Sequence, residues 1–194
     1  LINFCAAGPW LASARAGNVF GGGDWAQDRL VPDLVQAFLR GEPAHVRRPA
    51  AVRPWQHVLE PLSGYLWLGA NLFKSGRLHG EAFNFGPDQK VDKPVAELIK
   101  VFTPYWGKAA WKSAKTETGK KESMLLKLSC DKALSLLDWH AVLSFDETVK
   151  MTAEWYKKFY SGEKDMYAFS INQIKEYTLL AEKQKLAWAE AKLR

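Results

Sequence analysis

The spacing of hydrophobic residues predicts a series of helices along the chain. Apolar positions three or four residues apart mark one buried face in each helix, and Gly or Pro closes several of them. The expected helices span residues 30–39, 62–73, 95–102, 131–137, 144–159 and, as a Lys- and Glu-rich tail, 171–194. Asp28 is expected to cap the first helix. Ser144 and Glu147 form a capping box at the fifth, because each side chain satisfies an unpaired backbone N–H.

Short hydrophobic runs between these helices predict strands. Gly and Pro bound the runs, and both residues interrupt regular strand pairing. The expected strands lie within residues 11–20, 44–47, 55–58, 82–85 and 124–128. The first is expected to be buried and to lead into a loop at 21–24. Strands that alternate with helices in this way predict an α/β protein.

Length and composition fit one globular domain or slightly more. The chain has 194 residues, of which 47% are hydrophobic and 25% are charged, as in ordinary globular proteins. Its uncharged apolar runs fall far short of the roughly 20 residues of a membrane helix. No basic segment precedes the mildly apolar start, as it would in a signal peptide. Two cysteines, Cys5 and Cys130, suit a reducing compartment. We therefore expect a cytoplasmic protein without membrane contacts.

The net charge of +6 raises the question of nucleic-acid binding. Much of the excess lies in one segment, at Lys108, Lys112, Lys115, Lys120 and Lys121. A nucleic-acid site interleaves basic residues with stacking aromatic residues or carries them on a recognition helix. The centre of this segment has neither pattern and is expected to be a solvated loop. No nucleic-acid partner is expected.

Two local patterns suggest nucleotide chemistry but fit it poorly. The glycines at 21–23 suggest a phosphate-binding loop, yet a dinucleotide motif needs Gly-x-Gly-x-x-Gly directly before a helix. Tyr160 and Lys164 have the Tyr-x-x-x-Lys spacing of nicotinamide-dependent dehydrogenases, but Gly162 lies between them at the expected end of a helix. Chance explains this spacing better than a catalytic Tyr–Lys pair does. No metal site is expected, because no set of ligands has the required spacing.

Anion recognition is the strongest chemical signal. Asn18 follows a predicted strand, Arg47 ends another, and Arg53 precedes Trp55. Guanidinium groups bind phosphates through paired, charge-assisted hydrogen bonds, and Asn adds a neutral donor. Alternatively, the arginines pair with surface acids such as Asp24 or Glu60. Spacing alone leaves both interpretations open.

Three strings around these residues carry a resemblance to a known family. They are Arg-Ala-Gly-Asn-Val-Phe-Gly-Gly-Gly-Asp-Trp at 15–25, Asp-Arg-Leu-Val-Pro-Asp at 28–33 and Val-Arg-Pro-Trp-Gln-His-Val-Leu-Glu-Pro at 52–61. In these strings the chain resembles the sugar-nucleotide dehydratases and epimerases of the extended short-chain dehydrogenase/reductase family, and within it the branch that acts on CDP-glucose. Pro54 stands where relatives outside that branch usually carry Asp. Segments at 83–87 and 128–140 also match the family.

The resemblance implies only part of the family's fold. Family members begin with a Rossmann half that carries a Gly-rich NAD loop and a catalytic Tyr-x-x-x-Lys, and neither is found before Ala12. The implied fold is the C-terminal, substrate-binding part of an α/β, NAD(P)-binding Rossmann-type protein, with the N-terminal Rossmann half absent. Residues 1–177 would form this partial domain and 178–194 a helical tail. The surface that the other half would cover is expected to be apolar.

The resemblance also implies an activity. It is the NAD-dependent dehydration of CDP-glucose to CDP-4-keto-6-deoxyglucose, a lyase reaction of nucleotide-sugar metabolism such as lipopolysaccharide O-antigen synthesis. This chain would supply the part that binds CDP-glucose. The catalytic residues and most NAD contacts would lie on the absent half, so the chain alone is expected to be inactive. The full-length enzyme is expected to be a homodimer. The alternatives are another sugar-nucleotide dehydratase or epimerase, and a non-catalytic binding fragment.

Binding residues follow from the same resemblance. Asn18 is expected to contact the diphosphate and Arg53 to bind a phosphate. Leu30, Val31 and Arg47 are expected near the nucleotide base. Trp55, His57 and Asn84 lie in matching segments and are expected to support the site through packing more than through ligand contacts.

Overall fold

The computed structural model describes residues 9–88, 93–107, 109–113 and 125–190. Its helices are α1 (Leu30–Leu39), α2 (Leu59–Lys74), α3 (Val95–Phe102), α4 (Asp131–Leu137), α5 (Phe145–Tyr160), α6 (Met166–Lys183) and α7 (Ala187–Glu190), with 3-10 turns η1 (Gly76–Leu78) and η3 (Thr103–Trp106). Its strands are β1 (Ser13–Ala16), β2 (Asn18–Phe20), β3 (Ala44–Val46), β4 (Val52–Arg53), β5 (Trp55–His57), β6 (Ala82–Phe85), β7 (Lys93–Pro94) and β8 (Trp111–Ser113). The predicted α/β class is confirmed.

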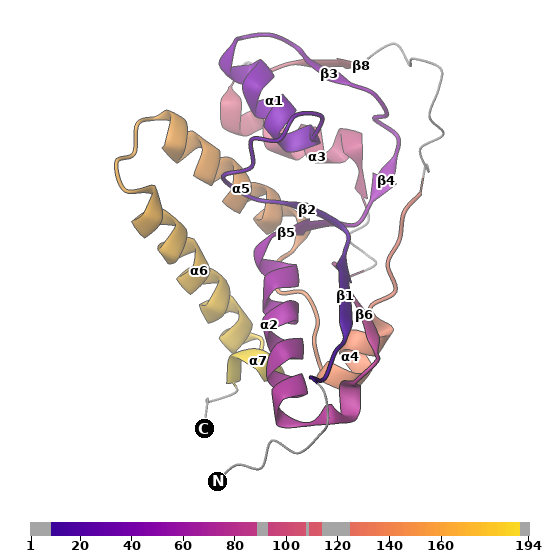
Figure 1. Cartoon of the computed structure of the whole chain (residues 1–194). Helices are drawn as coiled ribbons and strands as arrows, with labels where there is room; N and C mark the ends of the chain where they lie inside the picture. The colour runs from indigo at the N-terminus through magenta and orange to yellow at the C-terminus, as the bar shows by residue number, and fades with distance from the viewer. Residues whose placement is uncertain (1–8, 89–92, 108, 114–124, 191–194) are drawn as a thin grey trace.

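The strands form four pairs. Three are parallel, β1 with β6, β2 with β5 and β3 with β8, whereas β4 and β7 are antiparallel. One end of the molecule contains α1, α3, β3 and β8, and the other contains α2, α4, β1 and β6 (Figure 1). The β2–β5 pair lies between these ends. Its register places Asn18 opposite Trp55. Two predicted site residues are therefore neighbours in the sheet.

The largest core cluster holds α1, α3 and α5 together. Its fully buried members include Leu34, Val35, Leu98, Ile99, Phe102, Val149 and Tyr156. Phe20 of β2 and Trp55 of β5 belong to the same cluster. Burial of these aliphatic and aromatic side chains is the main favourable contribution to folding. It also fixes α1 and β3 in position over the β2–β5 pair.

Most of the predicted helices are confirmed. The apolar spacing predicted for α1 is correct, and Gly41, which follows the C-cap Arg40, has a φ of 68° that glycine adopts without strain. The capping box of α5 is present: the Ser144 N–H donates to Glu147 Oε2 at 2.8 Å, and the Glu147 N–H donates to Ser144 Oγ at 3.3 Å. The second predicted helix, α2, begins three residues earlier than expected.

Three local predictions are wrong. Asp28 does not cap α1, because Arg29 holds the N-cap position and Asp28 has a φ of 62°. The first strand is not buried: Ser13, Ala14 and Arg15 are exposed, since within the described residues β1 pairs only with β6. Residues 125–128, the described part of the predicted strand 124–128, do not form a regular strand; Leu125 forms an isolated bridge to Val52.

An apolar stripe covers the outer face of α2. Leu62, Leu66 and Phe73 are exposed, the last two at 76% and 87%. Their spacing of four and seven residues places them on one side of the helix. Contiguous exposed apolar surface of this kind is unusual and favours association. The expectation that the surface facing the other half is apolar stays a prediction.

The C-terminal helices pack against the rest of the chain. Helix α6 starts at Met166, earlier than predicted, and a break at 184–186 separates it from α7. Tyr177, Ala181 and Leu186 share a buried cluster with Val142 and Met151. The predicted domain boundary at residue 177 falls inside α6 and stays a prediction. In the part of the chain that the structure describes, no helix is both long and apolar enough to span a membrane.

Candidate functional site

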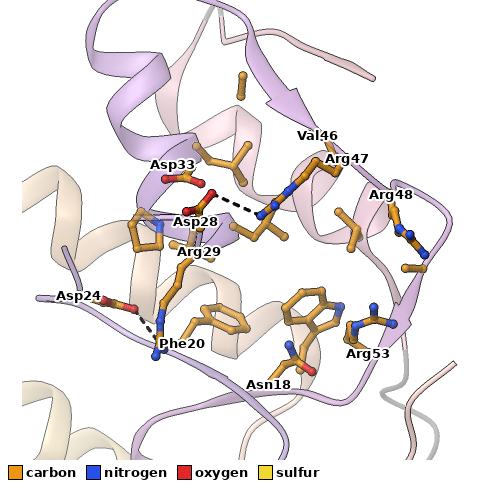
Figure 2. A pocket seen from close by; sticks show the side chains of 18 of the residues that line it. Asn18, Phe20, Asp24, Asp28, Arg29, Asp33, Val46, Arg47, Arg48 and Arg53 are labelled. Carbon is orange, nitrogen blue, oxygen red and sulfur yellow. Dashed lines mark ion pairs between the residues drawn. The ribbon is translucent and has the colours of Figure 1, made fainter. Parts of the chain in front are cut away.

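A cavity of about 540 Å3 lies where β2, α1, β3 and the β4–β5 segment meet. Phe20, Leu30, Val31, Val46, Ala51 and Val95 supply its apolar lining. Its polar lining comes from Asn18, Asp24, Asp28, Arg29, Asp33, His45, Arg47, Arg48, Arg53 and Trp55. A cavity of this size with a few converging polar groups is typical of small-molecule sites. Figure 2 shows Asp28 and Asp33 near Arg47 on one side of the cavity, and Arg48 and Arg53 on another.

Asn18 and Arg53 lie together at one end of the cavity (Figure 2). The Asn18 N–H donates to the carbonyl of Pro54 at 3.2 Å, which ties β2 to the segment that carries Arg53. Arg53 is only 6% exposed, and its Nη1 donates to the carbonyl of Val52 at 2.9 Å. A buried guanidinium is costly unless anionic or carbonyl oxygens satisfy its remaining donors. This end of the cavity is therefore suited to an anion.

Trp55 forms a rigid wall between this end and the core. Its Nε1 donates to the carbonyl of Lys93 at 2.8 Å, and its ring meets Phe20 edge to face with centroids 6.1 Å apart. It is 6% exposed. Both contacts fix the orientation of the indole. Trp55 therefore shapes the cavity while serving the packing role expected for it.

The α1 end of the cavity has mixed charge. Arg47 Nη2 lies 3.6 Å from Asp28 Oδ1, and Arg29 Nη1 lies 3.6 Å from Asp24 Oδ2. Burial and the neighbouring Asp28 carboxylate raise the pKa of Asp33, although Arg47 and the Asp28 N–H oppose the shift. Both ion pairs are largely solvent-exposed, so each contributes little to stability. They can rearrange around a ligand at small cost.

Six of the eight predicted binding residues line this one cavity. They are Asn18, Leu30, Val31, Arg47, Arg53 and Trp55. His57 and Asn84 lie elsewhere. His57 is 3% exposed, and its Nδ1 accepts from the Leu59 N–H at 3.3 Å at the start of α2. Asn84 Nδ2 donates to the carbonyl of Ser129 at 3.0 Å. The ligand roles of all eight stay predictions.

The alternative prediction was that the arginines pair with surface acids such as Asp24 or Glu60. One of those arginines does pair with a surface acid, but with neither of these two. Arg47 does pair with a carboxylate, but with Asp28, whereas Asp24 pairs with Arg29. Glu60 is not a surface acid, because it is only 1% exposed. Its carboxylate accepts hydrogen bonds from the backbone of Val142 and Leu143. Among the described residues, no ion pair joins a carboxylate to Arg53.

Several charged residues that line the cavity were not predicted as site residues. Among them are Asp28, Arg29, Asp33 and Arg48; in the sequence the first two look like a charged turn before a helix. No sequence spacing places these residues in one cavity with Arg53, because that arrangement depends on how α1 and β3 pack near β2. Only the folded structure shows that they share a cavity.

The Gly-rich loop packs against α5 and does not open into the cavity. A Cβ at Gly22 would overlap the ring of Trp155. The loop needs glycine for this close approach, so nothing here supports a phosphate-binding role. Tyr160 ends α5, and Gly162 then turns the chain with a φ of 83°. Tyr160 and Lys164 therefore do not share a helix face.

The basic segment lies largely outside the described residues. Lys108, Lys115, Lys120 and Lys121 belong to that part, and Lys112 lies on the short strand β8. In the described ranges, no group of three or more His, Cys, Asp or Glu side chains is arranged to hold a metal ion.

Comparison with known proteins gives this geometry a context. No protein-family model matches the chain. It is 41% identical over 175 residues, 90% of its length, to CDP-glucose 4,6-dehydratase of Salmonella typhimurium. The chain spans about half the length of that relative, 48%.

Solved structures agree on the fold. UDP-glucuronic acid 4-epimerase from Bacillus cereus, solved with UDP-glucuronic acid and NAD, matches with a TM-score of 0.64 and 19% identity. The match covers 76% of this chain and 45% of that one. dTDP-glucose 4,6-dehydratase from Bacillus anthracis, solved with NAD, gives a TM-score of 0.61 and 21% identity, covering 80% and 47%.

The chain thus has part of the α/β fold of the extended short-chain dehydrogenase/reductase enzymes that act on sugar nucleotides. In sequence it is similar to CDP-glucose 4,6-dehydratase, to which 90% of its length aligns. The resemblance drawn from residues 15–61 is confirmed.

Proposed function

We propose that the cavity binds the nucleotide part of CDP-glucose, and that the chain is the substrate-binding part of an NAD-dependent CDP-glucose 4,6-dehydratase. Asn18 and Arg53 bind the diphosphate, and Leu30, Val31 and Arg47 surround the base. The product of the complete enzyme is CDP-4-keto-6-deoxyglucose. We further propose that the complete enzyme is a homodimer.

One observation supports this proposal above the others: a buried arginine faces the cavity beside an asparagine amide (Figure 2). A diphosphate offers oxygens to both groups, and charge-assisted hydrogen bonds to a phosphate are short and strong. The ring of Trp55 and the aliphatic side chains of α1 supply apolar surface for the ribose and base.

In this proposal the NAD site lies outside the cavity described here. The cavity lining does not include the glycines at 21–23, of which Gly22 and Gly23 lie against Trp155 and Gly21 lies against Val58. We therefore propose that NAD, which supplies hydride transfer when bound, contacts residues beyond this chain. We propose that the acid and base of the reaction also lie beyond this chain, and that this chain alone does not catalyse it.

Titration of the chain with cytidine, CMP and CDP tests the proposal. Affinity should increase at each step, because each phosphate adds contacts with Arg53 and Asn18. Equal affinity for the three ligands would reject a phosphate site at Arg53. Absence of CDP binding at millimolar concentration would reject nucleotide binding by the cavity. Stronger binding of UDP or dTDP than of CDP would favour a dehydratase or epimerase for another sugar nucleotide.

A further inference from the structure

The loop before α1 contains a backbone outlier at the rim of the cavity. Asp28 has a φ of 62°, in the left-handed region that few side chains adopt. Asp tolerates this conformation better than most residues, at some cost in energy. Residues held in such conformations cluster at ligand-binding and catalytic positions. This loop is therefore a candidate for a specific role in the cavity.

Two charged neighbours lie close to Asp28. The Asp28 backbone N–H lies near the Asp33 carboxylate and opposes the rise in the pKa of Asp33. The Asp28 Oδ1 atom pairs with Arg47 Nη2 at 3.6 Å. Figure 2 shows Asp28 and Arg47 facing each other at the α1 end of the cavity, away from Asn18 and Arg53. The Asp28 side chain is 86% exposed, so one carboxylate oxygen can accept a further hydrogen bond from a ligand.

The two ends of the cavity differ in the ligand group that each favours. The buried Arg53 end favours an anion, and Asp28 lies at the opposite end of the same cavity, within the path of a ligand that extends along it. Cytosine carries an exocyclic amino donor at the position where uracil and thymine carry a carbonyl acceptor. A carboxylate accepts from the amino group and repels the carbonyl oxygen.

We propose that Asp28 makes the cavity selective for cytosine nucleotides over uracil nucleotides, by accepting a hydrogen bond from the cytosine amino group. The proposal rests on the proposed nucleotide function and adds a residue that determines the choice of base. Arg47, 3.6 Å from the Asp28 carboxylate, offers donors to the ring acceptors.

The test is the ratio of CDP to UDP affinity, measured by calorimetry at constant salt. The wild-type chain should bind CDP at least tenfold more tightly than UDP. Asp28→Asn replaces the carboxylate with an amide that can accept or donate, so the ratio should fall below threefold. Asp28→Gly removes the carboxylate and retains the backbone conformation, because glycine adopts positive φ freely. It should lower the ratio equally.

Glu176→Gln is the matched control. Glu176 is an exposed residue of α6 outside the cavity, and its substitution makes the same change in charge and chemistry. It should leave the ratio unchanged. A wild-type ratio near one, an unchanged ratio in both Asp28 variants, or an equal loss of CDP and UDP binding would overturn the base-reading role. Failure of the wild-type chain to bind either nucleotide would instead reject the proposed function, and the inference with it.

Discussion

Glu60 is a buried carboxylate whose ionisation should make folding stability depend on pH. It is 1% exposed and lies in the first turn of α2. It accepts hydrogen bonds from the N–H groups of Val142 and Leu143 and from the Tyr177 hydroxyl, at 3.0, 2.7 and 2.9 Å. Burial nevertheless dominates and raises the pKa of Glu60 from 4.5 to about 7. The folded state therefore binds a proton that the unfolded chain releases.

The sign and size of the effect follow from this pKa. Between pH 4.5 and 7 the folded state holds more protons than the unfolded state, so the Glu60 contribution to stability falls as pH rises. A tenfold change in proton affinity corresponds to about 1.4 kcal/mol, which gives a total of about 3 kcal/mol over this window. Glu60→Gln removes the titration while its amide oxygen still accepts from the loop.

His57 opposes Glu60 in the wild-type protein. Burial lowers the pKa of His57 from 6.5 to about 4, so its contribution to stability rises with pH between these values. The two slopes largely cancel from pH 4.5 to 6.5. The useful quantity is therefore the free energy of unfolding of Glu60→Gln minus that of wild type, in which His57 and all other shared groups drop out.

Urea unfolding at half-unit pH steps measures this difference. It should grow by about 3 kcal/mol between pH 4.5 and 7. The exposed Glu176→Gln is again the matched control, and its difference from wild type should stay flat. A Glu60→Gln difference that is also flat across this window would refute the claim that burial raises the pKa of Glu60.

Two further predictions concern packing and surface. Gly22→Ala should destabilise the fold by about 1–3 kcal/mol, because the new Cβ meets Trp155; Gly69→Ala on α2, with nothing within 4 Å of a Cβ, should not, and thermal melts compare them. The double variant Leu66→Lys, Phe73→Lys should reduce hydrophobic-dye binding and self-association, because it removes exposed apolar surface. It should keep its helix content, because both side chains are mostly exposed. Unchanged light scattering and dye binding would argue against association through this stripe.

Local sequence patterns predicted the helices well, because their signals are local. The spacing within α1 and α3 reflects one buried face, and the Ser144–Glu147 box acts within a single turn. The errors arise where distant contacts decide the outcome. Helix α2 begins early enough to bring Glu60 to Val142 and Leu143, which lie more than 80 residues away. Nothing near Glu60 in the sequence indicates that it is buried.

The site could be predicted only in part for the same reason. Asn18 and Arg53 were identified through strings that resemble a family, and the structure places both at one end of a cavity. Asp28 looked like a helix cap, because Asp before a hydrophobic helix is typical of that role. The pairing of Asp28 with Arg47 depends on β3 lying beside α1, and no periodic pattern encodes that arrangement.

The Arg53 variants test the central claim, that a shaped cavity binds the diphosphate of a cytidine nucleotide. Arg53→Ala should weaken CDP binding by about 2–4 kcal/mol, because it removes a charge-assisted partner from a partly buried anion. Arg53→Lys should recover only part of the loss, since an ammonium lacks the planar fork of guanidinium. Because Arg53 is buried, thermal melts first establish that both variants fold.

Arg77→Ala provides the matched control for charge. Arg77 is exposed, lies in η1 and does not line the cavity, so its loss removes one positive charge far from the proposed site. The most direct measurement is calorimetric titration of CDP into wild type, Arg53→Ala and Arg77→Ala at constant salt. The account predicts a loss of affinity of about 30-fold or more for Arg53→Ala alone. Equal affinities for the two variants would contradict it.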